Sequence, residues 1–220
     1  QDILTYLDRS FFTGVGGNMA MANVIAEINQ RIGSGFTWNN EITDTFKGPE
    51  SGNTMSFRDL LQKACEATRA VCYVGRDEVI NVKRYGFSDS VCSYDFDKVV
   101  QAPQISSDQR ITKVTCEYGD GLSRSAEDRD PSEIEQEVKM NPDLINTAAL
   151  AQSYADFLLE ENRKYKYDFT GRGNPELNLG DTITVFDKYG NSHEAIVMSH
   201  NLSYDGGLTE TIHALGGVIE

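Results

Sequence analysis

Basic residues are scarce in this 220-residue chain. Only 20 Lys and Arg face 34 Asp and Glu, which gives a formal net charge of −14. Proteins that hold a phosphate backbone use clustered Lys and Arg to release counterions, so the charge here has the wrong sign for that task. We therefore expect no direct nucleic-acid binding.

Long apolar runs are also missing. A membrane-spanning helix needs about 20 consecutive apolar residues, whereas the apolar runs of this chain are only a few residues long. The sequence therefore predicts no membrane insertion. With 39% hydrophobic and 25% charged residues, it has the composition of one or two ordinary globular domains with a sizeable core. The chain begins with Gln1 rather than Met, from which we expect a processed product or a fragment of a longer protein.

Cysteine is rare and lacks the spacing of a zinc site. The four cysteines stand at positions 65, 72, 92 and 116, whereas zinc ligands come in closely spaced pairs. The surrounding residues predict a helix around Cys65 and strands around Cys72 and Cys116, where a free thiol packs like a small apolar side chain. The sequence thus predicts free thiols, no metal site and folding in a reducing cytosol.

Histidine is rarer still, and no catalytic motif includes it. The histidines match no H-E-x-x-H pattern, and no Gly-x-Ser-x-Gly elbow occurs in the chain. We expect surface strand positions for all three, which are His193, His200 and His213. No residue is expected to be catalytic, to bind a metal or to bind a cofactor.

The amino-terminal part predicts a helix over residues 18–32. Apolar residues recur at spacings of three and four from Met21 to Ile28, which is typical of an amphipathic helix. Asn18 is the expected N-cap, and Gly33 is the expected terminator.

A second helix and a hairpin follow. Ser56 and Asp59 form a weak capping box ahead of another amphipathic segment. Two β-rich runs around a polar turn, at 71–74 and 79–82, predict a hairpin. We assign residues 1–86 to a small α+β domain with two helices and a β-hairpin.

The second half of the chain changes to short strands. Residues 119–140 are rich in acidic side chains and poor in large apolar ones, which predicts a solvated loop. A helix near 147–163 follows, with Asn146 or Thr147 as its cap. After it, turn signals separate the strands by roughly 8 to 12 residues, as expected of a small barrel or sandwich. We assign residues 87–220 to a β-rich, barrel-like domain with one packed helix, and the whole chain to the α+β class.

Glycine and proline cluster near the carboxyl end in a pattern that specifies backbone shape. Pro175 fixes its own φ and restricts Asn174, while glycines permit conformations closed to other residues. The run from Gly171 to Asp181 therefore predicts a tight crossing between strands, capped by the Asp181 side chain. A second run at 205–207 predicts the turn that returns the last strand to the sheet.

Four segments, taken in order, resemble tail-tip proteins of tailed phages and prophages. The family is that of baseplate hub or tail-associated (Tal-like) proteins. The segments are Ser56–Gln62, Asn141-Pro142 ahead of an Ala-rich helix, Gly171–Asp181 and Leu202–Leu208. Together with their flanks they cover roughly residues 55–85 and 140–217.

The resemblance implies a non-enzymatic structural component of the tail tip. Barrel-like domains of three identical subunits would form a ring or closed tip at the end of the tail tube. The implied partners are the distal tail protein, the tail tube and the tail fibres. The implied location is the virion tail, after synthesis in the cytoplasm of the bacterial host. The motif residues would shape the backbone, and they are Asn141, Pro142, Gly171, Gly173, Asn174, Pro175, Gly180, Asp181, Asp205, Gly206 and Gly207.

Two other functions stay open. Many members of this family carry lytic regions, so the chain is alternatively a fragment of a tail-associated enzyme that degrades peptidoglycan with a carboxylate pair. It is otherwise a host-glycan-binding adhesin, because Trp38 and the ten Tyr could stack on sugar rings.

Overall fold

The structure is a computed structural model and describes residues 7–217 except 15, 34, 76, 85, 87–88, 96, 107–109, 120 and 131. Asp120 and Pro131, in the expected acidic loop, lie outside the described residues. Helices and strands both occur, so the predicted α+β class is confirmed. None of the helices in the described part of the chain is long and apolar enough to cross a membrane.

The chain divides into two compact units. Unit 1 consists of residues 1–85 and 112–159, and unit 2 of residues 86–111 and 160–220. The elements of unit 1 are β1 (Phe11–Thr13), β2 (Asn18–Ala20), α2 (Met21–Ile32), β3 (Thr37–Asn40), β4 (Thr45–Lys47), β5 (Thr54–Ser56), α3 (Phe57–Thr68), β6 (Ala70–Val74), β7 (Val79–Arg84), β10 (Lys113–Tyr118), β11 (Leu122–Glu127), β12 (Glu137–Met140) and most of α4 (Ala148–Asn162). Those of unit 2 are β8 (Cys92–Tyr94), β9 (Val99–Ser106), β13 (Tyr165–Arg172), β14 (Thr182–Phe186), β15 (Ser192–Tyr204) and β16 (Leu208–Gly216).

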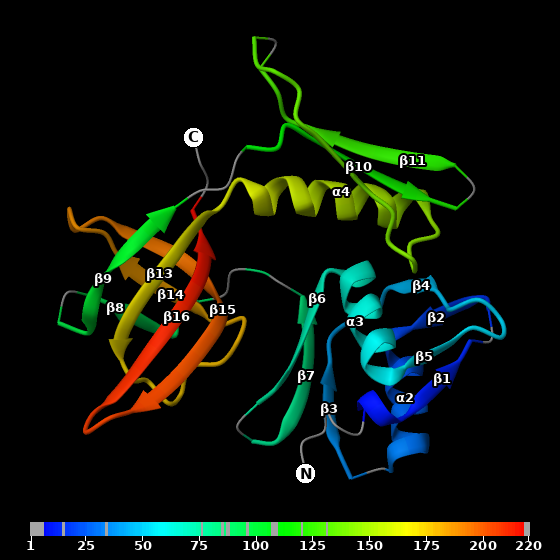
Figure 1. Cartoon of the computed structure of the whole chain (residues 1–220), viewed down its shortest axis with the longest axis horizontal. Helices are drawn as coiled ribbons and strands as arrows, with labels where there is room; N and C mark the ends of the chain where they lie inside the picture. Colours follow the sequence, from blue (N-terminus) through cyan, green and yellow to red (C-terminus); the bar gives the residue numbers. More distant parts are fainter. Residues whose placement is uncertain are drawn as a thin grey trace. The chain divides into compact units, whose positions relative to one another are not determined.

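In unit 1, α2 and α3 lie beside a sheet of β3, β7 and β6, in that order (Figure 1). The predicted hairpin is the antiparallel pair β6–β7. The predicted start of α3 is confirmed, because Ser56 Oγ accepts a hydrogen bond from the Asp59 N–H at 3.0 Å. Such a cap stabilises a helix by about 1 kcal/mol. Phe57, Leu60 and Ala64 are among the residues that α3 buries.

The start of α2 differs from the prediction. Asn18 lies in β2, opposite Lys47 of β4, so its backbone is engaged in a strand pair and the prediction of an Asn18 cap is wrong. The helix begins at Met21. Asn23 supplies the local bond instead, since its Oδ1 accepts a hydrogen bond from the Ala20 N–H at 2.9 Å.

The acidic segment 119–140 contains strands where the sequence predicted a loop. β11 pairs antiparallel with β10, and β12 pairs parallel with β10. Gly119 and Gly121 have φ values of 57° and 76°, which permit the tight turn between β10 and β11. Ala126 is buried among exposed neighbours on β11. The low apolar content therefore reflects a sheet with one solvated face.

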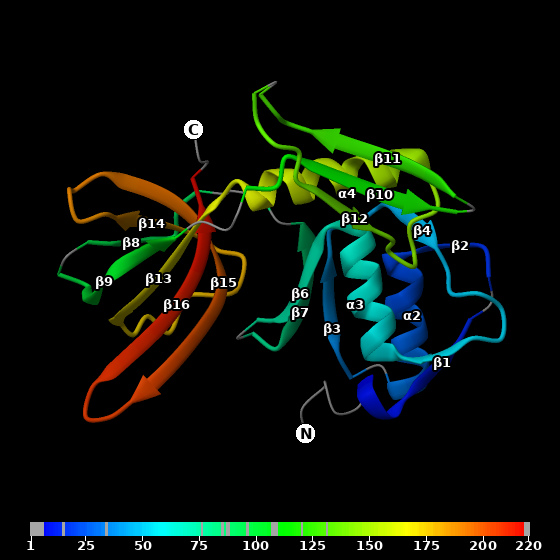
Figure 2. The same ribbon diagram turned by 45° about the horizontal axis from the view of Figure 1, so that its top comes forward.

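The helix expected near 147–163 is α4, which lies along β10 and β11 (Figure 2). Thr147 caps it by accepting a hydrogen bond from the Leu150 N–H at 3.2 Å. The Tyr154 hydroxyl donates to Glu66 of α3 at 2.9 Å. Residues 112–159, which were expected to group with the later strands, belong to unit 1.

Unit 2 is a curled sheet in the order β8-β14-β15-β16-β13-β9 (Figure 1). The strand pairs are antiparallel except for β8 with β14, which is parallel. Alternate residues of the strands point into one apolar core, as the period of two requires. Its members are Tyr94, Tyr167, Phe169, Leu177, Ile183, Val185, Ala195, Val197, Ile212 and Ala214.

Candidate functional site

The run from Gly171 to Asp181 connects β13 to β14 in unit 2. Asp181 Oδ2 accepts a hydrogen bond from the Asn178 N–H at 2.8 Å, which closes the end of the crossing. Gly180 has a φ of 79°, a value that favours glycine. Its N–H donates to Val197 O at 2.8 Å, and the Val197 N–H donates to Asp181 O at 2.9 Å. The crossing is therefore fastened to β15.

Gly173 allows a close approach between the crossing and the last hairpin. A Cβ at this position would lie 2.4 Å from Cγ of Leu208, so no larger residue fits without displacement. The Gly173 N–H donates to Leu208 O at 3.0 Å. The next residue, Asn174, forms an Asx turn, in which its Oδ1 accepts from the Glu176 N–H at 3.0 Å.

Glu210 on β16 is a buried acidic residue at the centre of this region. Its Oε1 accepts a hydrogen bond from the Tyr94 hydroxyl at 2.7 Å. Its Oε2 accepts from the Asn174 N–H at 3.0 Å and contacts Nε2 of His200 at 2.8 Å. A carboxylate only accepts hydrogen bonds, so the imidazole presents its Nε2–H to Glu210. Three donors from β8, the crossing and β15 thus converge on one side chain of β16.

Burial dominates the electrostatics of this network. The side chains of Glu210 and His200 are 0% and 7% exposed. Burial, followed by the hydrogen bond to Glu210, raises the pKa of Tyr94 far above its usual range, so the hydroxyl remains a donor. Gly171 makes room for the network, because a Cβ there would lie 3.1 Å from both Glu210 Oε1 and a ring carbon of Tyr94.

The remaining motif residues lie in two other places. Asp205, Gly206 and Gly207 form the turn between β15 and β16, with a φ of 71° at Gly206 and an Asp205 N–H that donates to Gly207 O at 3.2 Å. Asn141 and Pro142 belong to unit 1. The structure therefore brings together the motif residues between 171 and 181, while the pair 141–142 contributes to a different site.

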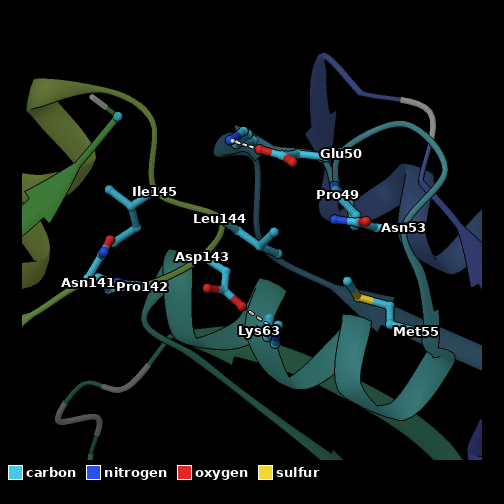
Figure 3. Close-up of a pocket in the computed structure, with 13 residues that line it drawn as sticks. Pro49, Glu50, Asn53, Met55, Lys63, Asn141, Pro142, Asp143, Leu144 and Ile145 are labelled. Atoms are coloured by element: carbon cyan, nitrogen blue, oxygen red, sulfur yellow. Dashed lines mark hydrogen bonds and ion pairs between the residues drawn. The ribbon is translucent and has the colours of Figure 1, made fainter. Parts of the chain in front are cut away.

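That site is a pocket of about 420 Å³ in unit 1, where Asn141 and Pro142 line one wall (Figure 3). Figure 3 shows Glu50, Pro49 and Asn53 on the facing side. The backbone joins the two walls, because the Lys47 N–H donates to Leu144 O at 2.8 Å.

Two carboxylates line this pocket, and each is paired with a lysine. Glu50 contacts Lys47 Nζ at 3.3 Å, and Asp143 forms an ion pair with Lys63 (Figure 3). Their side chains are 70% and 62% exposed. A glycosidase acid is kept protonated by apolar surroundings, which neither carboxylate has. These two residues therefore do not give the pocket one carboxyl group that is kept protonated beside another that is kept ionised, as a glycosidase requires.

Each of the three histidines contacts an acidic side chain of unit 2. His193 approaches Asp187 at 3.4 Å, and His213 pairs with Asp168. The prediction of a surface position is wrong for His200, whose side chain is only 7% exposed and contacts the fully buried Glu210. In the described part of the chain, no group of three His, Cys, Asp or Glu residues could hold a metal ion.

The cysteines are free, as predicted. Cys65 and Cys116 are buried, and burial raises the pKa of these thiols to about 12 and about 11. Burial also raises the pKa of Cys92, the thiol nearest to Tyr94 and Asn174. Catalytic cysteines show the opposite shift, towards the thiolate.

The network of Glu210, His200 and Tyr94 was not predicted from the sequence. One signal was present, because Glu210 stands in register with the inward residues Ile212 and Ala214 at a period of two. A charge at an inward strand position indicates a buried partner set. The partner Tyr94 lies 116 residues away in the sequence, which no local pattern reveals.

The chain is similar to known proteins in its fold alone. No protein-family model matches the chain, and no curated protein sequence is similar to it. The tail protein from Neisseria meningitidis MC58 has a TM-score of 0.72 at 15% identity, and the match covers 97% of this chain and 72% of that one. The 43 kDa tail protein of prophage MuSo2 from Shewanella oneidensis has a TM-score of 0.61 at 16% identity, and the match covers 94% of this chain and 65% of that one.

Two further structures share the fold. Prophage tail protein gp18 from Listeria monocytogenes EGD-e has a TM-score of 0.58 at 12% identity, with 94% of this chain and 68% of that one covered. A chain of the native gene transfer agent virion has a TM-score of 0.66 at 16% identity, but the match covers only 48% of it. This chain thus has a fold found in phage and prophage tail proteins, and it spans part of their length.

Proposed function

We propose that this protein is a structural component of a phage or prophage tail, located at the tail tip as part of the baseplate hub. The observation that carries the proposal is a similarity of fold to a tail protein over 97% of the chain. The Gly- and Pro-rich crossing supports a structural role, because the Asp181 side chain accepts a hydrogen bond from the backbone of the crossing and the Asn174 N–H donates to the buried Glu210 carboxylate.

The proposed partners are other tail proteins, namely the distal tail protein, the tail tube and the fibres. In the assembled tail we expect a homotrimer, in which three curled sheets contribute to a ring. Light scattering of the assembled hub measures the number of subunits. A homotrimer predicts three copies of the 24.4 kDa chain for each hub. Two or six copies would contradict it.

Deletion of the coding sequence tests the structural role. We expect electron micrographs of the resulting lysate to show particles without completed tails, and supply of the protein in trans to restore them. Infectious particles with normal tails would overturn the proposal.

Two observations weigh against the other candidate functions. The two carboxylates of the unit 1 pocket are exposed and paired with lysines. The indole N–H of Trp38 donates to Asn29 Oδ1 of α2 at 3.1 Å, which fixes the half-buried ring in unit 1. On a peptidoglycan zymogram we expect no clearing, and a cleared zone would favour the lytic enzyme instead.

A further inference from the structure

Unit 2 contains a small pocket beside the crossing. Its volume is about 220 Å³, and its walls come from β8, from Lys98 and from the segment 172–175. Cys92 and Asn174 are among the lining residues. The pocket therefore adjoins the Gly- and Pro-rich motif without including Glu210, whose two oxygens are already occupied.

Two cations stand side by side at this pocket. The Arg172 N–H donates to Lys98 O at 2.8 Å, which holds the two residues next to each other across β13 and the start of β9. Lys98 Nζ donates to Ser93 O at 2.9 Å. The backbone hydrogen bond thus holds the main chains of Lys98 and Arg172 together, and Ser93 of β8 holds the Lys98 ammonium group.

Within the described residues, these cations lack the carboxylate partners that other cations have. Among the described residues, neither Lys98 nor Arg172 forms an ion pair with a carboxylate. Lys47 and Lys63, which line the unit 1 pocket, are each paired with an acid of the same chain. In a chain with a net charge of −14, Lys98 and Arg172 thus bring two positive charges without ion pairs to this pocket. The buried Glu210, which hydrogen-bonds Tyr94 and Asn174 of the lining, opposes them, since it raises the pKa of Cys92 while Lys98 lowers it.

The size of the pocket limits what it can hold. Pockets for small molecules and cofactors are about 300–1,000 Å³, so 220 Å³ is too small for a nucleotide or an oligosaccharide. It accommodates a single acidic side chain. A planar guanidinium matches a carboxylate in a two-point contact, and an ammonium adds a point charge.

We propose that Lys98 and Arg172 form a docking site for a carboxylate side chain of an adjoining protein. The identity of that protein as a tail subunit rests on the proposed function. The site itself is a property of the free chain, so a test on the isolated protein separates the two.

Cys92 provides a reporter inside the pocket, and Cys72, a half-buried thiol of unit 1, provides an internal control. The purified protein is treated with methanethiosulfonates that carry either a sulfonate or a trimethylammonium group, and labelling is measured per cysteine by mass spectrometry. The ratio of the two rates at one thiol cancels its thiolate fraction, and therefore the effect of its raised pKa.

We expect the anionic-to-cationic rate ratio at Cys92 to exceed that at Cys72 by about fivefold or more, since one charge at about 5 Å in water changes a rate about fourfold. The double variant Lys98→Gln with Arg172→Gln should abolish this excess. A control with the same net charge, Arg124→Gln with Lys188→Gln, should keep it. Equal ratios at the two thiols, or an excess that survives in the first variant, would overturn the docking site.

Glutarate serves as the carboxylate probe in a second measurement. We expect millimolar glutarate to slow the alkylation of Cys92 by iodoacetamide at least twofold in the native chain, and to have no effect in the Lys98→Gln, Arg172→Gln variant. Unchanged alkylation in the native chain would contradict the proposal. Either result leaves the deletion experiment on tails unaffected, so failure of the site and failure of the proposed function are distinguishable.

Discussion

At the residue scale, Glu210 links segments that are distant in the sequence. Its carboxylate receives the Tyr94 hydroxyl, the Asn174 N–H and the His200 ring. Loss of one partner from such a buried set leaves the others unsatisfied, which costs more than the loss of an exposed hydrogen bond.

We therefore expect Glu210→Ala to reduce the free energy of unfolding by about 3–5 kcal/mol, measured by urea denaturation. Glu210→Gln, which keeps one acceptor, should cost less. Glu160→Ala, at an exposed position of α4, is the control and should change stability by no more than about 0.5 kcal/mol. Equal effects at the two positions would contradict the role of Glu210.

Gly173 provides a second test at this scale. A methyl group there would overlap Leu208 Cγ, 2.4 Å away, so Gly173→Ala should destabilise unit 2 by about 1–3 kcal/mol in the same assay. The double variant Gly173→Ala with Leu208→Ala should recover most of that loss. Gly207→Ala is the matched control, because a Cβ there meets no atom within 4 Å.

At the scale of elements, local signals in the sequence were sufficient where a structure depends on near neighbours. The Ser56 cap of α3 joins residues three apart and was predicted. Asn18 failed as a cap because Lys47, its partner in the strand pair, is distant in the sequence. The strands of 119–140 were missed for a similar reason, since their pairing with β10 leaves a polar outer face that resembles a loop.

The edges of the unit 2 sheet are protected against further strand pairing. β8 at one edge is only three residues long, and β9 at the other edge contains Pro103, which cannot donate to a neighbouring strand. Contacts with other proteins are therefore expected through side chains, as at Lys98 and Arg172, rather than through added strands.

The turn between β14 and β15 predicts a pH dependence. Asp187 accepts hydrogen bonds from the Asn191 side chain and from the N–H groups of Asn191 and Tyr189, and these bonds, with the one to His193, lower its pKa to about 2. A carboxyl whose folded pKa is depressed stabilises the protein above its unfolded value of about 3.9, and this contribution is lost as the pH falls towards 2.

We expect native protein to be more stable than Asp187→Asn above pH 5, and the difference to shrink between pH 4 and about 2. Urea denaturation across this pH range measures it. A difference that stays constant down to pH 2 would contradict the assignment of the shift to Asp187.

At the scale of the whole molecule, the α+β class followed from the sequence because helix and strand periodicities are strong. Of the candidate site, only the path of the backbone was predicted from the sequence. Gly171, Asn174 and Asp181 mark the crossing from the sequence alone, but the charged groups beside it, Glu210 and the pair Lys98 and Arg172, come together only through the curled sheet.

Gold-labelled antibodies against this protein, imaged on intact particles by electron microscopy, test the central claim most directly. A structural component of the hub predicts label at the tip of the tail, at the end remote from the head. Label confined to the head or spread along the tube, or particles that carry no label while the lysate contains the protein, would contradict it.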